Sequence, residues 1–245
     1  MTKLPRPPLD RLTGAALFLD LDGTLLDIAD RPEGVSLEAG MAELLGVLRR
    51  QLGGRLAVVS GRSLEQIDAI LGPCAADIAV SASHGCEHRW EGVLARPDRP
   101  ASLDTVIRQL HAFARDWPGV IVEDKSFGAA LHYRMAPGAA EAVDALALSL
   151  AEASGLYLQR GKMVAELRVA GGDKGAAVRT LMRQAPLAGS RPIFAGDDLT
   201  DEPAFIAARE MGGDAILIGE PRETAANYGL SSPAELRDWL REAAR

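Results

Sequence analysis

The sequence predicts an α/β protein: a parallel sheet with helices, and a smaller lobe of α+β type inserted into it. Near both ends of the chain, short and continuously apolar runs alternate with amphipathic segments of helical period, which is typical of strands buried on both faces. In the middle of the chain the short runs alternate apolar and polar residues, as strands of an antiparallel sheet do. We assign residues 1–86 and 170–245 to the core and residues 87–169 to the inserted lobe.

The N-terminal part of the core reads as strand, helix, strand, helix, strand. Apolar residues repeat at helical spacing through residues 37–52. Ser63, with Gln66 three residues later, predicts the capped start of a second helix at residues 63–71. The expected strands lie at residues 15–20, 56–59 and 78–82. This alternation is typical of a parallel sheet.

The inserted lobe is expected to hold two helices and four strands. Amphipathic spacing predicts helices at residues 102–117 and around residues 143–150, and strands at residues 120–125, 129–135, 156–160 and 162–169. In the last strand Lys162, Glu166 and Arg168 fall on one face. The polar faces of two other strands carry Glu123, Lys125, His132 and Arg134. A face of this kind is either a solvated sheet surface or a surface that binds a polyhydroxyl ligand.

After residue 170 the parallel pattern resumes. A helix is expected from Gly175 to Met182, and Ser232-Pro233 predicts the start of a closing helix at residues 232–243. Between them we expect a strand at residues 192–195, a helix at residues 202–209 and a strand at residues 215–219.

Composition and charge exclude several classes of protein. The 245 residues are 47% hydrophobic and 25% charged, as in a soluble globular chain, and the net charge of -7 argues against a nucleic-acid partner. Cys74 and Cys86 form neither a disulfide framework nor a CxxC pair. No apolar run is long enough for a signal segment or a membrane span, so we expect a cytoplasmic protein without a membrane partner.

Reactive side chains gather at the ends of predicted elements. Because ligands bind outside the carboxyl ends of the strands of an open parallel sheet, residues far apart in sequence are expected to share one site. A turn would explain any one of these motifs, whereas all of them together, in this order, predict catalysis. The residues are Asp20 and Asp22, Ser60, Lys174, and Asp197 and Asp198 with Asp201.

These residue types suit the hydrolysis of a phosphate ester. Asp20 can attack phosphorus to form an aspartyl-phosphate, and Asp22 can protonate the leaving alcohol and then deprotonate the attacking water. Lys174 can neutralise charge on Asp20 and on the transferring group. Carboxylates are hard ligands that suit Mg²⁺, and the expected metal ligands are Asp20, Asp22, Asp197 and Asp198. The expected phosphate-binding residues are Gly23, Thr24, Ser60 and Gly61.

The motifs resemble those of a known superfamily. Asp20-Leu21-Asp22-Gly23-Thr24-Leu25, Ser60-Gly61-Arg62, Lys174 and Gly196-Asp197-Asp198 are similar to the four motifs of haloacid-dehalogenase-type phosphohydrolases. The resemblance implies a Rossmann-like core with a parallel sheet, an inserted α+β cap that is mobile, bound Mg²⁺ and an aspartyl nucleophile.

Further stretches, within roughly residues 15–220, resemble the trehalose-6-phosphate phosphatase family. They are Ser83-His84-Gly85-Cys86-Glu87, Val122-Glu123-Asp124-Lys125, His132-Tyr133-Arg134, the run from Gly161 to Arg168, Asp173-Lys174-Gly175 and the run from Gly196 to Glu202. The resemblance implies that the cap residues Glu123, Lys125 and Glu166 hold sugar hydroxyls. It also implies that Arg62 and His84 line the core side of that cleft and that Asp201 orients Lys174.

The chain departs from that family at two places. Leu21 stands where an aromatic residue is frequent, and Val169-Ala170-Gly171-Gly172 stands where a proline is usual, which predicts a more flexible hinge.

The resemblance implies a Mg²⁺-dependent phosphatase that acts on trehalose 6-phosphate and has this sugar phosphate as its partner. The apolar positions are all needed for two cores, so we expect a monomer. Three alternatives stay open: a sister phosphatase for sucrose 6-phosphate or a glucosylglycerate phosphate, a phosphomutase, and a non-catalytic sugar-phosphate sensor. The complete set Asp20, Asp22, Lys174 and Asp197 argues against the sensor, because a sensor need not keep a nucleophile.

Overall fold

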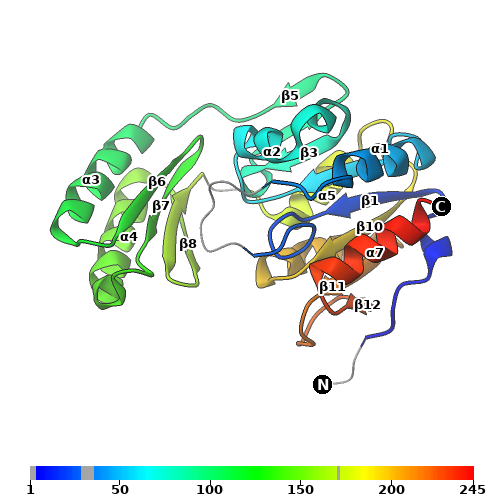
Figure 1. The fold of residues 1–245 in the computed structure, drawn as a ribbon. Coiled ribbons are helices and arrows are strands. Elements are labelled where there is room, and N and C mark those ends of the chain that lie inside the picture. The colour runs from blue at the N-terminus through cyan, green and yellow to red at the C-terminus, as the bar shows by residue number, and fades with distance from the viewer. Residues whose placement is uncertain (1–3, 29–35, 170–171) are drawn as a thin grey trace. The chain divides into compact units, whose positions relative to one another are not determined.

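A computed structural model describes residues 4–28, 36–169 and 172–245 of the chain (Figure 1). The chain divides into two compact units, one formed by residues 1–96 and 172–245 and the other by residues 97–171. The hinge departure expected at residues 169–172 falls partly on residues 170–171, which lie outside the described residues.

The first unit is built on an eight-stranded sheet with the order β12-β11-β10-β1-β2-β3-β4-β5. The six strands from β12 to β3 run parallel, and β4 and β5 are antiparallel to their neighbours. The parallel α/β fold expected from the sequence is therefore confirmed. The strands are β1 (Ala15–Leu19), β2 (Leu56–Val59), β3 (Ala79–Ala82), β4 (Glu87–Trp90), β5 (Val93–Ala95), β10 (Arg191–Gly196), β11 (Asp214–Ile218) and β12 (Tyr228–Leu230).

Helices cover both faces of this sheet, which explains the continuously apolar strands. In β1, Leu17 and Leu19 belong to the hydrophobic cluster under α1, α2 and α7, whereas Ala16 and Phe18 belong to the cluster under α5 and α6. Alternate side chains thus enter two cores, and neither face can carry polar residues. The helices are α1 (Met41–Gln51), α2 (Leu64–Leu71), α5 (Lys174–Leu181), α6 (Glu202–Glu210) and α7 (Pro233–Ala243).

Short segments of 3-10 helix lie in both units. In chain order, from η1 to η5, they are Leu9–Leu12, Gly72–Asp77, Ser83–Gly85, Pro137–Ala139 and Leu199–Asp201.

The side chains of Ser63 and Gln66 cap the start of α2, as their spacing in the sequence predicted. The Ser63 hydroxyl accepts the Gln66 backbone N–H at 3.2 Å, and the Gln66 side chain accepts the Ser63 N–H at 3.0 Å. This reciprocal capping box satisfies two backbone donors that a helix start otherwise leaves open.

The observed boundary between the two units differs from the predicted one by one β-hairpin. We placed the start of the inserted lobe at residue 87, but β4 and β5 form a hairpin that pairs with β3 in the large sheet, and the first unit continues to Arg96. The register joins Ala82 to Glu87 and Val80 to Arg89. The sequence concealed this hairpin because its first strand, Glu87-His88-Arg89-Trp90, has neither an apolar run nor apolar alternation.

The second unit is an antiparallel sheet with helices on one face, as the sequence predicted. Its four strands have the order β6-β7-β9-β8. Residues such as Leu131 and Leu167 point from the sheet into a cluster that includes Leu110 and Val143 of the two helices. The elements are α3 (Leu103–Asp116), β6 (Ile121–Lys125), β7 (Gly128–His132), α4 (Ala140–Ser154), β8 (Tyr157–Gly161) and β9 (Val164–Arg168).

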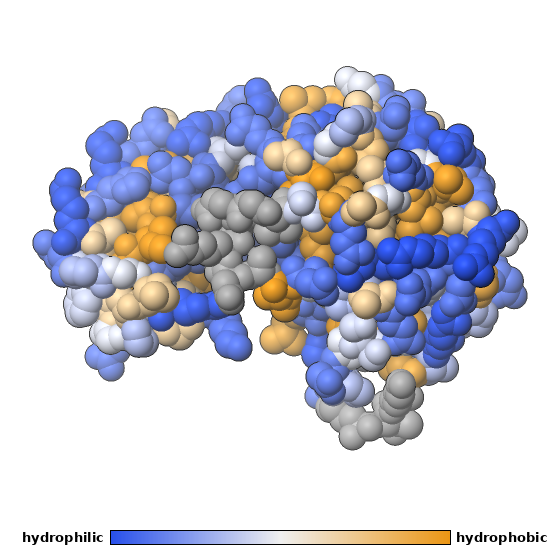
Figure 2. Space-filling model, viewed as in Figure 1, coloured by the Kyte–Doolittle hydropathy of each residue, from blue (hydrophilic) through white to orange (hydrophobic). Residues whose placement is uncertain are grey.

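The visible surface is mostly hydrophilic, and apolar side chains reach it in separate patches (Figure 2). In the described residues, no helix is both long enough and apolar enough to cross a membrane.

A buried carboxylate joins the amino ends of the parallel strands. Asp214, the first residue of β11, is 2% exposed and accepts hydrogen bonds from Arg11 at 2.8 and 2.9 Å, from Arg191 at 2.7 Å and from Asn227 at 2.9 Å. Burial alone would raise the pKa of Asp214, but the bonds from Arg11 and Asn227 and the arginine charges outweigh it and lower the pKa. Asp214 therefore stabilises the fold most where it is ionised.

We expect Asp214→Ala to lower the free energy of unfolding by about 2–3 kcal/mol at neutral pH, because it leaves two guanidinium groups without their shared carboxylate. Since the pKa of Asp214 is lowered in the folded state, the difference should be complete above about pH 5 and should shrink as the pH falls below about 4. Urea unfolding of the parent and the variant from pH 3 to pH 8 measures this difference in free energy. Asp238→Ala, which removes an exposed pair with Arg241, is the control and should cost at most about 0.5 kcal/mol. Equal effects of the two substitutions would contradict the assignment.

Candidate active site

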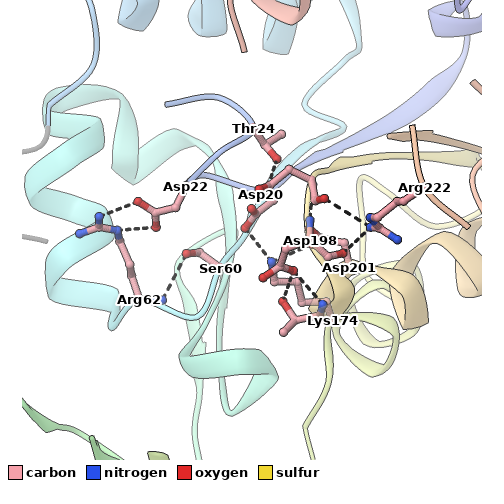
Figure 3. A network of polar contacts seen from close by, with 11 residues as sticks. Asp20, Asp22, Thr24, Ser60, Arg62, Lys174, Asp198, Asp201 and Arg222 are labelled. Carbon is pink, nitrogen blue, oxygen red and sulfur yellow. Dashed lines mark hydrogen bonds and ion pairs between the residues drawn. The ribbon is translucent and has the colours of Figure 1, made fainter. Parts of the chain in front are cut away.

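The predicted reactive residues converge at one edge of the first unit (Figure 3). Asp20 follows β1, Ser60 follows β2 and Asp197 follows β10, and these three strands are neighbours or next neighbours in the sheet. Lys174 is the first residue of α5, whose start is capped by the Asp173 side chain. The carboxyl ends of parallel strands thus bring together residues that are up to 177 positions apart.

Lys174 is buried between two carboxylates. Its ammonium lies 2.8 Å from the nearer Asp20 oxygen and 2.7 Å from an Asp201 oxygen, and all three residues are at most 4% exposed. The predicted contact between Asp201 and Lys174 is therefore present. Such a placement is favourable only because the buried ammonium is paired on both sides.

Asp201 also organises the loop that follows β10. Its second carboxylate oxygen accepts the backbone N–H groups of Asp197 at 2.9 Å and of Asp198 at 3.1 Å. One side chain therefore holds both the ammonium and the acidic loop in place. Gly196 is required beside it, because a Cβ there would lie 2.4 Å from the Asp201 carboxyl carbon.

Three of the predicted acidic residues form a cluster with an excess of negative charge. One oxygen from each of Asp20, Asp197 and Asp201 lies within 4.8 Å of the others. Against these three carboxylates stands one ammonium, so two negative charges are uncompensated when all are ionised. A single divalent cation would balance them.

The pKa values reflect this excess. Burial, and then the nearby charge of Asp201 and Asp198, raises the pKa of Asp197 to about 6. Burial likewise raises the pKa of Asp20 well above its ordinary range, although Lys174 opposes the shift. Burial works against the charged form of Lys174, but the surrounding carboxylates outweigh it and raise the pKa of its ammonium. The single ammonium of Lys174 thus does not offset burial and mutual repulsion at Asp20 and Asp197.

The cluster fits a hard divalent cation. Its donors are carboxylate oxygens, which Mg²⁺ and similar ions prefer. Both Asp201 oxygens already accept hydrogen bonds, which leaves Asp20 and Asp197 as the better candidates for direct ligands. The other two predicted ligands are Asp22, whose side chain pairs with Arg62, and Asp198, whose side chain accepts hydrogen bonds from Thr200.

Asp22 is held by Arg62. The guanidinium donates to both Asp22 oxygens, at 2.7 and 2.6 Å, in a bidentate pair. The sequence resemblance implied that Arg62 lines the sugar cleft, and the structure shows that it also pairs with the predicted acid/base. Asp198 uses one oxygen to cap the following turn, accepting the Thr200 N–H at 2.7 Å and the Thr200 hydroxyl at 2.6 Å.

The turn after Asp22 brings its residues against Asp197. The Thr24 hydroxyl donates to Asp197 at 3.2 Å, and Gly23 adopts a φ of 81° so close to Asp197 that a Cβ would lie 2.2 Å from its carboxylate oxygen. The backbone N–H of Gly23 donates to the Leu26 carbonyl and that of Thr24 to the Leu21 carbonyl. The two predicted phosphate-binding amides are therefore engaged within the turn.

A strained turn places His84 beside the end of β2. Ser83, His84 and Gly85 all have positive φ angles, of 51°, 53° and 89°. The His84 ring lies so close to Gly61 that a Cβ on the glycine would be 2.4 Å from it. Non-glycine residues seldom hold such angles unless their surroundings enforce them, and here the buried Glu87 carboxylate accepts the Ser83 hydroxyl at 2.9 Å.

The second unit collects the predicted sugar-binding residues on its uncovered sheet face. Glu123, Ala130 and Glu166 lie in register across β6, β7 and β9, on the face opposite the helices. Lys125 donates to Glu166 at 3.0 Å, and Glu123 is 2.8 Å from the His132 ring. The strand β7, which pairs with both β6 and β9, contributes the small residues Gly128 and Ala130 to this region of the sheet.

The sequence reasoning gave no role to two groups near the site. Glu87 and Ser83 lie in one of the stretches that resemble the family, and the structure shows that they support the His84 turn. Arg222 reaches the backbone of Asp197 and Asp198 from a loop after β11 (Figure 3). It belongs to no recognisable motif, so only the folded structure could reveal it.

Comparisons with known proteins extend these findings. The trehalose-phosphatase family model matches residues 18–233. A probable trehalose-phosphate phosphatase of Sinorhizobium fredii is 38% identical over 223 residues, covering 90% of this chain and 83% of its own length. The Escherichia coli trehalose-6-phosphate phosphatase is 36% identical over 230 residues, covering 92% and 85%.

Solved structures agree with the fold. A trehalose-6-phosphate phosphatase related protein superposes with a TM-score of 0.81 at 29% identity, over 93% of this chain and 96% of that chain. The C-terminal domain of the Candida albicans trehalose-6-phosphate phosphatase has a TM-score of 0.80 at 21% identity, over 98% of both chains, and shows the same fold.

The doubly covered parallel sheet, with a buried aspartate–lysine–aspartate group at its carboxyl edge, defines a phosphoric monoester hydrolase of haloacid-dehalogenase-like fold. The match over most of the chain narrows this class further. The chain belongs to the trehalose-phosphatase family.

We expect Gly23→Ala to weaken the binding of a divalent cation by about tenfold or more, a change of about 1.4 kcal/mol, because the new methyl group displaces the Asp197 carboxylate. Gly14→Ala is the matched control: Gly14 has a φ of 68° but no atom within 4 Å of its Cβ position. Both variants should therefore lose about 1–2 kcal/mol of stability from backbone strain, and only the first should lose affinity. Titration with Mn²⁺, followed by electron paramagnetic resonance, measures the affinity. Equal losses in both variants would mean that strain, and not the displaced carboxylate, is responsible.

Proposed function

We propose that the protein hydrolyses trehalose 6-phosphate to trehalose and phosphate, with Mg²⁺ as its cofactor. The observation that carries the proposal is the buried contact of Asp20 with Lys174, beside the carboxylate of Asp197. The names of the relatives, together with the match of the family model, support trehalose 6-phosphate as the substrate.

In the first step an Asp20 oxygen attacks phosphorus, and the bond from phosphorus to the sugar oxygen breaks. Asp22 gives its proton to the departing sugar oxygen, and phosphate becomes an acyl phosphate on Asp20. Asp22 must leave the Arg62 guanidinium and carry a proton for this step, since an ion-paired carboxylate has none to give.

In the second step Asp22 takes a proton from water, and the water oxygen attacks the phosphorus. The bond from phosphorus to Asp20 breaks, which frees the phosphate and restores the carboxylate. Lys174 stays paired with Asp20 and Asp201 throughout and offsets the negative charge of the transferring group. Asp20 and Asp197 would hold Mg²⁺, which would supply further charge neutralisation there.

Ser60 is the side-chain donor we propose for the phosphate. Its hydroxyl is almost fully buried and accepts the Arg62 backbone N–H at 3.2 Å, which leaves its own hydrogen free to point at a phosphate oxygen. Gly23, Thr24 and Gly61 then serve chiefly by their small size and their turn geometry, because the two turn amides already have acceptors.

We propose that the second unit acts as a cap that supplies the contacts with the sugar. Glu123, Lys125 and Glu166 present two acceptors and one donor on one sheet face, and sugar hydroxyls can pair with both kinds. Polar groups that are buried, as Glu166 is, or half-buried, as the other two are, penalise ligands that lack the matching hydroxyls. His84 would complete the contacts from the first unit.

We expect Asp20→Asn to abolish phosphate release from trehalose 6-phosphate, by at least about a thousandfold, because the amide is a poor nucleophile. Asp238→Asn, an exposed change on α7, is the control and should leave turnover unchanged. Phosphate release with Mg²⁺ measures both, and circular dichroism establishes that both variants are folded. Turnover of folded Asp20→Asn within tenfold of the parent would overturn the nucleophile assignment.

A panel of sugar phosphates tests the substrate and the role of the cap. We expect the highest kcat/KM with trehalose 6-phosphate, above sucrose 6-phosphate and a glucosylglycerate phosphate, and we expect free phosphate rather than an isomerised sugar phosphate as the product. Glu166→Gln should raise KM for trehalose 6-phosphate by about tenfold, the value of one lost charged hydrogen bond, while kcat/KM for p-nitrophenyl phosphate stays the same. Glu152→Gln, an exposed change on α4, is the control. Equal losses with both substrates would show that Glu166 does not contact the sugar.

A further inference from the structure

Arg222 binds the main chain of the acidic loop from the side opposite Asp201. It lies in the loop between β11 and β12, and its guanidinium donates to the Asp198 carbonyl at 2.7 Å and to the Asp197 carbonyl at 3.3 Å (Figure 3). Hydrogen bonds from a charged donor are stronger than those from a neutral one.

Both the N–H groups and the carbonyl groups of the acidic loop therefore have side-chain partners. Asp201 accepts the N–H groups of Asp197 and Asp198, and Arg222 donates to their carbonyls. These contacts fix the peptide units on both sides of the Asp197 and Asp198 side chains. Because a side chain follows the orientation of its backbone, they also determine where the Asp197 carboxylate points.

Glu202 holds Arg222 in this position. It forms an ion pair with Arg222, and its other oxygen accepts the Ala225 N–H at 2.8 Å. The arginine also donates to the Glu223 carbonyl at 3.1 Å, while its Nε is buried without a partner among the described residues. A buried donor without an acceptor is unfavourable, so the other contacts must outweigh that cost.

The charge of Arg222 matters as well. Asp197, Asp198, Asp201 and Glu202 lie within six residues of chain, and they would repel one another without nearby cations. Lys174 offsets this charge by pairing with Asp20 and Asp201, whereas Arg222 offsets it through its contacts with the loop carbonyls and with Glu202. Arg222 can therefore stabilise the loop before any metal ion is bound.

We propose that Arg222 is a positioning residue that presets the Asp197 carboxylate for a divalent cation. The inference rests on the proposed function only in that it takes Asp197 as a metal ligand. Arg222 contacts neither substrate nor metal, and it acts through the backbone of the loop that carries the ligand.

The test compares the divalent-ion affinity of Arg222→Met and Arg222→Lys with that of the parent protein. Electron paramagnetic resonance of free Mn²⁺ reads the affinity directly, without substrate. We expect Arg222→Met to weaken Mn²⁺ binding about tenfold or more, and Arg222→Lys to weaken it less, because lysine keeps the charge but not the fork of two donors. Phosphate release should then need a higher Mg²⁺ concentration and recover its kcat at saturation.

Arg209→Gln is the matched control. Arg209 donates to the Ala225 carbonyl at 3.1 Å, in the same loop, so the variant removes a similar charge and a similar bond without touching the acidic residues. Its Mn²⁺ affinity should stay within twofold of the parent. Thermal unfolding establishes that each variant is folded, and if Arg222→Met does not fold, Arg222→Lys decides alone.

The outcomes separate this inference from the proposed function. Weaker Mn²⁺ binding in the Arg222 variants supports the inference even if trehalose 6-phosphate is not a substrate. Unchanged Mn²⁺ affinity in a folded Arg222 variant overturns it, and so does an equal loss in Arg209→Gln or a parent protein that binds no Mn²⁺.

Discussion

The burial of the Lys174 ammonium between Asp20 and Asp201 is the interaction on which the rest of the site depends. An ammonium this deep in a protein is stable only with charged partners, and its two partners come from the end of β1 and the start of α6. Three elements that are distant in sequence must therefore meet before the charge is satisfied. The sheet supplies that meeting point, because its strand order places β10 directly beside β1.

Hydrogen bonds connect Lys174 and its two carboxylate partners to the rest of the site. Asp201 gives one oxygen to Lys174 and the other to the acidic loop, and Asp197 in that loop accepts from Thr24 in the turn after β1. The result is a closed circuit of contacts around a patch of excess negative charge. Repulsion of this kind is relieved by a bound cation, so the electrostatics of the cluster fit a divalent metal ion.

Sequence reasoning succeeded where periodicity and backbone chemistry decide the structure. The buried strands, the Ser63 cap and the gathering of Asp20, Lys174 and Asp197 follow from apolar runs and from the geometry of parallel sheets. It missed the β4–β5 hairpin, since a polar strand at a sheet edge has no distinct pattern. It also missed the partners of Arg62 and Arg222, because long flexible side chains choose their contacts only after the backbone is in place.

The two ends of the parallel strands do different work. The acidic cluster and its electrostatic repulsion lie at the carboxyl ends, whereas the amino ends hold the hydrogen-bonded group of Asp214, Arg11, Arg191 and Asn227. Sites so far apart contribute nearly independently to the free energy. Substitutions around Asp214 therefore change the thermal tolerance of the fold with little effect on the acidic cluster at the other end, so the two properties are adjustable one at a time.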